Sequence, residues 1–367
     1  MRVPLVDLGA QQREIGDEVR AGLDEVFEAT AFIGGPAVGR FERAYAQYVG
    51  ATHCVGVANG TDAIELALRA VGVRPGGEVI LPANTFIATA EAVSRLGAVP
   101  VLIDVDPVHL LVDPAAVRAA VGPRTEAIVP VHLFGQLAPV EAIGKIAADA
   151  GVPMVEDAAQ AQGARRDGRA AGSFGLAAGT SFYPGKNLGA AGDAGAVTTS
   201  DGVVARAVRV LGAHGSARKY DHEVIGMNSR LDTLQAVVLE AKLRRLEAWN
   251  DARRAAAARY EALLADVPGV RTPTVVPGNE DVWHLYVVQV DDRDRVLNGL
   301  NEAGIGAGIH YPTPVHLTGA YAHLGHGVGA FPVAEAAAGR ILSLPMYPHL
   351  TAEQQEAVVD ALAEAVR

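Results

Sequence analysis

The chain has 367 residues, of which half are hydrophobic, and its 42 acidic against 31 basic residues give a net charge of −11. This length favours two domains, and the acidic balance argues against nucleic acid as the main partner. No apolar run approaches the roughly 20 residues of a membrane span, the N-terminus lacks a signal-peptide core, and the single cysteine, Cys54, excludes an internal disulfide and favours the cytoplasm.

Strand and helix patterns alternate through the first two thirds of the chain. Helical periodicity appears at 15–29 and, after the breaker at 34–36, at 39–49. Apolar, β-branched runs then predict buried strands at 54–58, 79–82, 99–103, 128–131, 152–155, 180–183 and 194–199. Between most of them lie helical patterns at 62–71, 85–96, 114–121 and 140–150. Strands that are apolar on both faces and separated by helices predict an α/β fold with a mostly parallel, covered sheet.

The pattern changes in the last third. A long helical stretch, 231–264, leads into a loop marked by prolines and Gly278. A strand at 282–290 and helices at 293–303, 334–340 and 352–366 then predict a smaller α+β unit. We therefore expect a large domain, 1–240, and a small C-terminal domain, 241–367.

The segment Asn59-Gly60-Thr61-Asp62 follows the first strand and leads into a helix. Glycine lets a backbone approach a ligand closely, and a helix N-terminus offers free N–H groups and a positive dipole end, which suits a phosphate. The alternative is an ordinary capped helix, because Asp62 and Glu65 have a spacing similar to a capping box. The segment alone does not separate the two interpretations.

Two chemically active residues follow later strands. Asp157 ends one apolar run, and Lys186 lies in the loop Ser181–Gly189 after the next. Alone, Lys186 is more often a solvated amine, and a buried Asp–Lys ion pair is another alternative. A desolvated lysine, however, has a lowered pKa and can form Schiff bases. Pyridoxal phosphate needs such a lysine and a carboxylate against its ring nitrogen, and Phe86 could cover its ring.

Four segments spread along the chain match motifs that occur together in one enzyme family. They are Asn59–Ala63, Glu156–Gln160, Ser181–Asp193 and Gly226–Gln235. With them, nearly the whole chain resembles the DegT/DnrJ/EryC1/StrS sugar aminotransferases, which are pyridoxal phosphate enzymes. The resemblance implies an aspartate-aminotransferase-like fold (fold type I) and a homodimer with active sites at the interface. It also implies transfer of an amino group, usually from L-glutamate, to a nucleotide-linked keto-sugar.

The resemblance also assigns roles by position. Lys186 is the residue that holds the cofactor aldehyde, and Asp157 pairs with the pyridine nitrogen. The other implied cofactor contacts are Gln160 at the ring hydroxyl, Phe86 on the ring face, Gly60, Thr61 and Ser181 at the phosphate, and Asn228 at the phosphate of the neighbouring subunit. The candidates for binding the sugar and its diphosphate are Tyr183, Lys219, His310 and Tyr311.

Gln160 is informative about the position that is aminated. In the resembled family, members that aminate position 4 usually carry His there, whereas Gln is typical of position 3. The run 308–317 is also similar to the 3-amino group. The pattern is closest to dTDP-3-keto-6-deoxyhexose 3-aminotransferases of antibiotic and surface-sugar pathways. The sequence departs from the residues common in the resembled family at Gln162, Arg166 and Thr318-Gly319. These differences bear on the identity of the sugar rather than on the reaction.

Several alternatives stay open at this point. The chain could aminate C-4 of a nucleotide sugar or a cyclitol, or it could run another reaction of the same cofactor, such as a dehydration. The dehydratases of the resembled family replace the lysine by histidine, whereas Lys186 is present. A pyridoxal phosphate-binding regulator or partner-activating protein without catalysis is the alternative from another class. No metal is expected, because the histidines between 310 and 326 match no compact zinc pattern.

Overall fold

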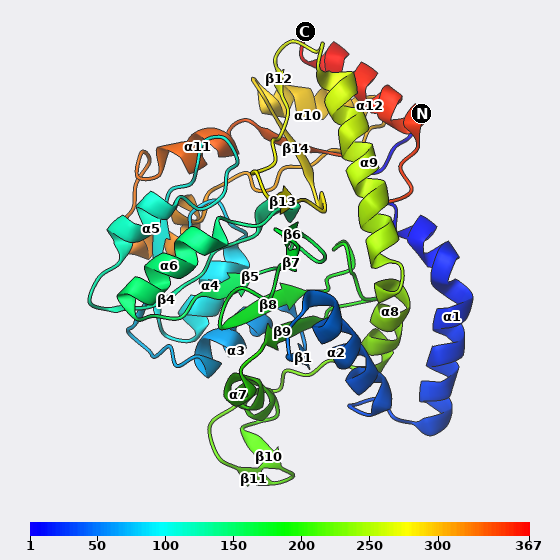
Figure 1. Ribbon diagram of the computed structural model, residues 1–367. Helices are drawn as coiled ribbons and strands as arrows, with labels where there is room; N and C mark the ends of the chain where they lie inside the picture. The colour runs from blue at the N-terminus through cyan, green and yellow to red at the C-terminus, as the bar shows by residue number, and fades with distance from the viewer.

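The computed structural model describes residues 1–367 and has one large sheet with helices on both faces (Figure 1). A four-stranded and a three-stranded part join through parallel bridges between Ile128 and Met154 and between Val131 and Asp157. In spatial order the strands are β1 (His53–Val57), β9 (Gly195–Thr199), β8 (Ala177–Ser181), β5 (Val155–Asp157), β4 (Thr125–Ile128), β2 (Glu78–Pro82) and β3 (Val99–Ile103). Only β9 runs antiparallel to its neighbours, so the predicted mostly parallel sheet is confirmed.

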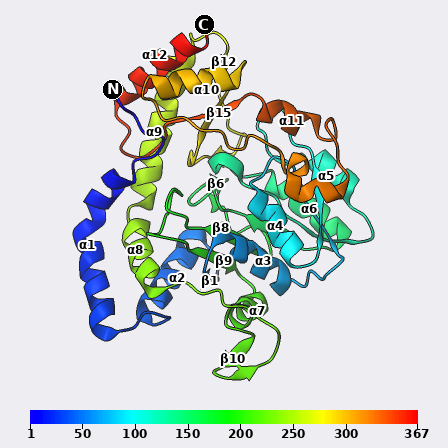
Figure 2. The ribbon, with the colours of Figure 1, turned by 180° about the vertical axis from the view of Figure 1, so that it is seen from behind.

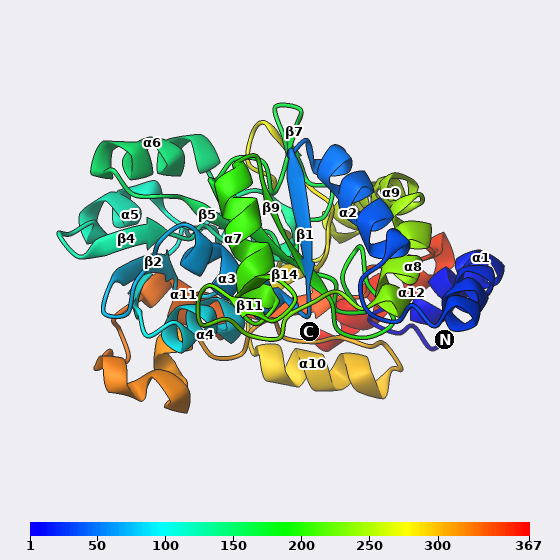
Figure 3. The same ribbon diagram turned by 90° about the horizontal axis from the view of Figure 1, so that it is seen from below.

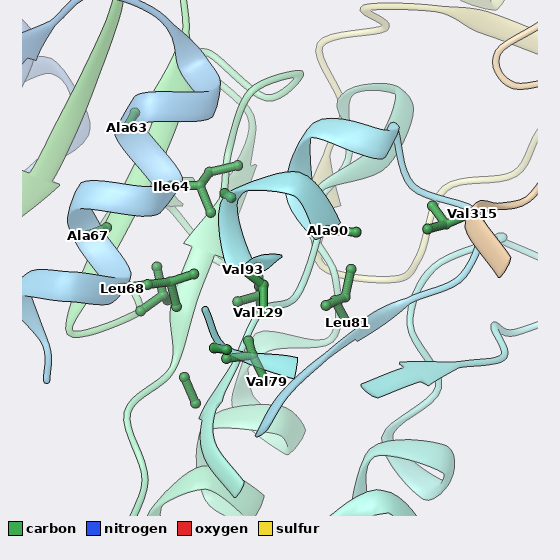
Figure 4. Packing of buried hydrophobic residues seen from close by; sticks show 14 of the residues in the cluster. Ala63, Ile64, Ala67, Leu68, Val79, Leu81, Ala90, Val93, Val129 and Val315 are labelled. Atoms are coloured by element: carbon green, nitrogen blue, oxygen red, sulfur yellow. The ribbon is translucent and has the colours of Figure 1, made fainter. Parts of the chain in front are cut away.

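Alternate residues of each strand pack on opposite faces of this sheet, as the two-residue period of a strand requires. On β2, Val79 and Leu81 join the core beneath α3 and α4, whereas Ile80 joins the core beneath α5 and α6. Figure 4 shows the first of these cores, with side chains of α3, β2 and α4 pointing toward one another. The covering helices are α2 (Pro36–Val49), α3 (Gly60–Ala70), α4 (Ile87–Arg95), α5 (Pro114–Ala120), α6 (Val140–Ala150) and α7 (Gly202–Gly212).

The single long helix predicted over 231–264 is wrong. The chain forms α8 (Thr233–Leu243) and α9 (Leu246–Leu264), which separate at Arg244 and Arg245. The two helices have different partners, since α8 packs on α1 (Leu8–Ala29) and α2, and α9 packs on α12 (Ala352–Ala365). Both arginines at the break form ion pairs with Glu18 of α1. Figure 2 shows α1 beside α8 and α9 continuing toward the C-terminal elements.

The C-terminal elements surround an antiparallel sheet of β12 (Val270–Arg271), β14 (Tyr286–Val290) and β15 (Ile341–Leu344). The helices here are α10 (Arg293–Glu302), α11 (Pro332–Ala338) and α12, with short 3-10 turns at Val315–Leu317 and Gly319–Leu324. A further 3-10 turn, Leu133–Gly135, lies between β4 and α6. Val3 pairs with Ile305 and lies in the same core, so the N-terminus is tied to this unit. The domain boundary near residue 240 stays a prediction.

Two smaller features lie outside these sheets. A sheet of β6 (Arg165–Arg166), β7 (Arg169–Ala170) and β13 (Asn279–Glu280) links the two parts of the chain. The hairpin β10 (Ser216–Arg218)–β11 (Asp221–His222) extends beyond α7 and is seen from below in Figure 3. No helix in the structure combines the length and the apolar character that crossing a membrane would require.

Helix α3 lies so close to β8 that the strand needs a glycine. A Cβ on Gly179 would lie 2.9 Å from the backbone nitrogen of Ile64, and a backbone atom of a buried helix cannot move aside locally. We expect Gly179→Ala to lower the free energy of unfolding by about 1–3 kcal/mol or more. Gly144→Ala on α6, where a Cβ meets only the end of Met154 at 3.8 Å, should instead raise it by about 0.5–1 kcal/mol.

The midpoint of thermal unfolding of the two apoproteins measures this difference. Equal midpoints for Gly179→Ala and the wild type would contradict the close packing of α3 on β8.

Candidate active site

One cavity of about 810 Å³ opens at the carboxyl ends of β1, β2, β5 and β8. This is the edge at which open α/β sheets bind their ligands. Ten residues singled out from the sequence line it together: Gly60, Thr61, Phe86, Asp157, Gln160, Ser181, Tyr183, Lys186, His310 and Tyr311. The structure therefore brings together residues that lie up to 251 positions apart in the chain.

Lys186 is a desolvated amine. Its side chain lines the cavity, and burial lowers its pKa to about 8, against an opposing effect of the Asp157 carboxylate. The preceding turn closes through a hydrogen bond from the Lys186 N–H to the Tyr183 carbonyl. At neutral pH, roughly a tenth of such an amine is uncharged and nucleophilic, several hundred times the fraction of an exposed lysine.

Asp157 lies at the end of β5 and is buried. The Thr89 hydroxyl donates to its Oδ2 over 2.7 Å, and the Ala159 N–H donates to its Oδ1 over 3.1 Å. Burial raises the pKa of this carboxyl, and the two hydrogen bonds and the charge of Lys186 oppose the rise. Thr85 makes a hydrogen bond with Thr89, 2.8 Å between hydroxyl oxygens, and so extends the network toward Phe86.

Glu156, the neighbour of Asp157, points to the opposite face and does not line the cavity. It is fully buried and lies 2.9 Å from His132 Nε2. Its two oxygens also accept hydrogen bonds from the N–H groups of Gly172, Phe174 and Gly175. These partners hold its pKa below the usual value despite burial. Of the two adjacent acids, Glu156 therefore holds neighbouring segments of the fold together, whereas Asp157 lines the cavity.

The N-terminus of α3 forms another wall. Asn59 caps this helix by accepting from the Asp62 N–H over 2.8 Å, so the helix is capped, but not by the Asp62 and Glu65 pair that the alternative interpretation named. Asp62 and Glu65 instead pair with Arg95 of α4, at 3.3 and 2.9 Å. The N–H groups of Gly60 and Thr61 donate to no protein atom and are free for an anion.

Gly60 is required by the close approach of this helix to β8. A Cβ at this position would lie 2.6 Å from the Cβ of Ser181. The Ser181 hydroxyl is thereby brought beside the free N–H groups of Gly60 and Thr61. Gln162, Arg166 and Thr318, the departures noted in the sequence, do not line the cavity.

A further wall includes the segment between α10 and the 3-10 turn Val315–Leu317. Tyr311 accepts a hydrogen bond from Gln160 Nε2 over 3.0 Å, and Gln160 Oε1 accepts from the Phe134 N–H over 2.6 Å. The Phe86 and Tyr311 rings lie 5.0 Å apart between centroids, inclined by 35°. His310 is held 2.8 Å from the Ser343 hydroxyl, and burial lowers its pKa to about 4.

Two predicted site residues lie elsewhere. Lys219 is exposed on the β10–β11 hairpin, with its ammonium 5.1 Å from the centre of the Tyr220 ring. Asn228 is exposed and its backbone pairs with Ala213. Neither residue lines the cavity of its own chain.

Sequence reasoning missed Thr89 and His284, both of which line the cavity. Thr85 and Thr89 are four residues apart in the helix predicted over 85–96, so their spacing was a usable signal, although α4 begins only at Ile87. His284 stands between apolar residues before β14, and only its position in the fold gives it meaning.

The comparisons with known proteins agree with this geometry. The model of the DegT/DnrJ/EryC1/StrS aminotransferase family matches residues 13–363. Over 362 residues, 99% of both chains, the protein is 48% identical to the erythromycin biosynthesis sensory transduction protein EryC1 of Saccharopolyspora erythraea. It is 45% identical to the dTDP-3-amino-3,4,6-trideoxy-alpha-D-glucose transaminase of Streptomyces venezuelae, covering 99% of this chain and 96% of that one.

Among solved structures, DesV of S. venezuelae in complex with a ketimine intermediate superposes with a TM-score of 0.97 at 45% identity, over 100% of this chain and 99% of that one. A family match along nearly the whole chain and a shared fold of this extent leave one conclusion. The protein belongs to the DegT/DnrJ/EryC1/StrS aminotransferase family.

Proposed function

We propose that this protein transfers the amino group of L-glutamate to C-3 of a dTDP-linked 3-keto-6-deoxyhexose. The observation that carries the proposal is one cavity with a desolvated Lys186, a buried Asp157 and an anion-binding helix end. The family supplies the reaction, transamination with pyridoxal phosphate. The position and the substrate class are proposed from the transaminase of S. venezuelae and from Gln160.

The residues of the cavity fit pyridoxal phosphate. The free N–H groups at the start of α3 and the Ser181 hydroxyl suit a phosphate, and Gly60 leaves the space that a Cβ would fill. Asp157 and Lys186 line the same cavity and interact electrostatically. Phe86 is half exposed at the wall, where a flat ring can stack on it.

When bound, this cofactor supplies an electron sink for the carbon that loses its proton. Asp157, held by Thr89, would keep the pyridine nitrogen protonated, and its burial strengthens that charge pairing. Lys186 would hold the cofactor covalently and, once displaced, move the proton at the reacting carbon as a general base and acid. Its pKa of about 8 suits both roles near neutral pH.

We place the keto-sugar against the wall of Tyr183, His310 and Tyr311, beside Gln160, which we assign to the ring hydroxyl of the cofactor. The Gln160 side chain is held at both ends, by Phe134 and by Tyr311, so it offers a fixed shape rather than a mobile amide. We also propose a homodimer in which Asn228 reaches the cofactor phosphate of the neighbouring subunit. The exposed Lys219 would then bind the substrate diphosphate.

The alternatives differ in what they predict for one assay. Offered a panel of ketones, a C-4 aminotransferase would aminate 4-keto sugars and a cyclitol aminotransferase would aminate keto-inositol. A non-catalytic pyridoxal phosphate-binding regulator would aminate none of them. We expect the purified protein with glutamate to aminate dTDP-linked 3-keto sugars, with the new C–N bond at C-3 by NMR. It should not aminate 4-keto sugars or keto-inositol at comparable rates.

Lys186→Ala should lower this turnover by at least about 10³-fold, because both the covalent attachment and the proton transfer are lost. Lys145→Ala, which removes an exposed lysine of α6, is the matched control and should leave turnover unchanged. Retained turnover in Lys186→Ala would refute the assigned role. A wild-type protein that binds the cofactor but aminates no ketone would favour the regulator.

The pKa of Lys186 predicts how cofactor capture depends on pH. Only the neutral amine attacks an aldehyde, so with a pKa of about 8 the capture rate should rise about tenfold from pH 6 to pH 7 and level off above pH 8. Mixing apoprotein with pyridoxal phosphate in a stopped-flow spectrometer and following the visible band measures this rate. A rate that keeps rising through pH 10 would mean that the amine has the pKa of an exposed lysine.

A further inference from the structure

His284 lines the cavity beside Lys186 but has no part in the functions assigned so far. Its ring has one hydrogen-bond partner in the protein, Asn187, whose Oδ1 lies 3.2 Å from His284 Nδ1. Which of the two ring nitrogens carries the proton decides what His284 offers to a bound molecule. The surroundings of Asn187 decide that question.

The orientation of the Asn187 side-chain amide is fixed by the Val282 carbonyl oxygen, which can only accept a hydrogen bond. Asn187 Nδ2 lies 2.9 Å from the Val282 carbonyl oxygen and 2.9 Å from Asn250 Oδ1. A flipped amide would place two acceptors against each other at Val282, so the NH₂ group must be on that side. Asn250 is fixed in turn, because its own NH₂ donates to the Gln162 carbonyl over 2.9 Å.

With its NH₂ group used, Asn187 presents a carbonyl oxygen to His284. Two acceptors cannot share a hydrogen bond, so His284 Nδ1 carries the proton. The second ring nitrogen, Nε2, makes no hydrogen bond with the protein. A doubly protonated ring is disfavoured, because burial and the nearby charges of Lys186 and Arg253 lower the pKa of His284 well below its ordinary value.

We propose that His284 is a positioning residue whose Nε2 lone pair, fixed by Asn187, accepts a hydrogen bond from a hydroxyl of the bound keto-sugar. The identity of the ligand group rests on the proposed function. A neutral acceptor suits a neutral hydroxyl, whereas the ammonium of an amino donor is matched better by a carboxylate. The other acceptors on the cavity wall include Asp157, Asp193 and Glu91, which are acids.

The protonation pattern is tested without any turnover. In holoenzyme labelled with ¹⁵N-histidine, the two ring nitrogens of His284 are assigned by their loss in His284→Gln. We expect Nδ1 to be protonated and Nε2 to be unprotonated at pH 7, and Asn187→Ala to weaken that preference. A protonated Nε2 in the wild-type enzyme would overturn the proposal.

The role is tested by separating the two halves of the reaction in single-turnover experiments. His284→Phe should lower the rate constant of the keto-sugar half about 10- to 100-fold and change the glutamate half by less than about twofold. His284→Gln, which keeps an acceptor, should recover most of the loss. His323→Phe, on an exposed 3-10 turn, is the matched control.

Equal losses in both halves would overturn the proposal, since they would mean that His284 only supports the loop of Lys186 and Asn187. An unaffected keto-sugar half would overturn it too. A wild-type enzyme that aminates no nucleotide-linked keto-sugar would be a failure of the proposed function instead. The protonation pattern of His284 can be measured in each of these cases, because it does not depend on the substrate.

Discussion

The close approach of helix α3 to strands β8 and β9 is the constraint on which the site depends. Three glycines make it possible: a Cβ on Gly60 would meet Ser181, one on Gly179 would meet Ile64, and one on Gly195 would lie 2.4 Å from the Asn59 carbonyl oxygen. Side chains at these positions would push the helix N-terminus away from the sheet edge. The unpaired N–H groups of Gly60 and Thr61, the Ser181 hydroxyl and Lys186 would then no longer share one cavity.

The two adjacent acids of β5 show how the fold separates structural from chemical charge. A strand turns successive side chains to opposite faces, so Glu156 and Asp157 enter different surroundings. His132 and three backbone N–H groups satisfy Glu156 completely. Asp157 has fewer partners, Thr89 and the Ala159 N–H, and lines the cavity, where its carboxylate can accept a further hydrogen bond. Removing a partner from a buried acid costs more than removing one at a surface.

Much of this arrangement was predictable, because it follows from patterns local to a few residues. The existence and order of the strands between 54 and 199 follow from apolar runs and the turn residues between them. Three of their bounds were wrong: β4 and β8 begin and end before the residues expected, and β5 after them. Pro130 and Pro153, which cannot donate hydrogen bonds, lie in the stretches expected for β4 and β5. Helix α7 was not predicted, since its valines also suit a strand. Strand β15 and the break between α8 and α9 depend on packing partners far away in the chain.

The cavity residues found from the sequence were those with a distinctive chemistry or a family motif. Asn59 rather than Asp62 caps α3, and the two residues are close enough in sequence for either to fit the pattern. His284 acquires its role only through Asn187 and Val282, whose contacts no periodicity reveals. The roles proposed for Lys219 and Asn228 have no counterpart in this cavity, since neither residue lines it. The sequence does not show how one polar side chain orients another, as Asn187 orients His284.

The wall formed by His310 and Tyr311 is anchored to the large sheet as well as to the small unit. The Val315 N–H donates to the Ala83 carbonyl over 2.9 Å, and Tyr321 lies 3.1 Å from the Ser94 hydroxyl. His310 and Tyr311 lie in one short stretch of chain, whereas Asp157 and Lys186, which we propose to handle the nitrogen, belong to strand ends far away in sequence. Under the proposed function, exchanging this stretch would change the sugar that fits the cavity and would leave Asp157 and Lys186 in place.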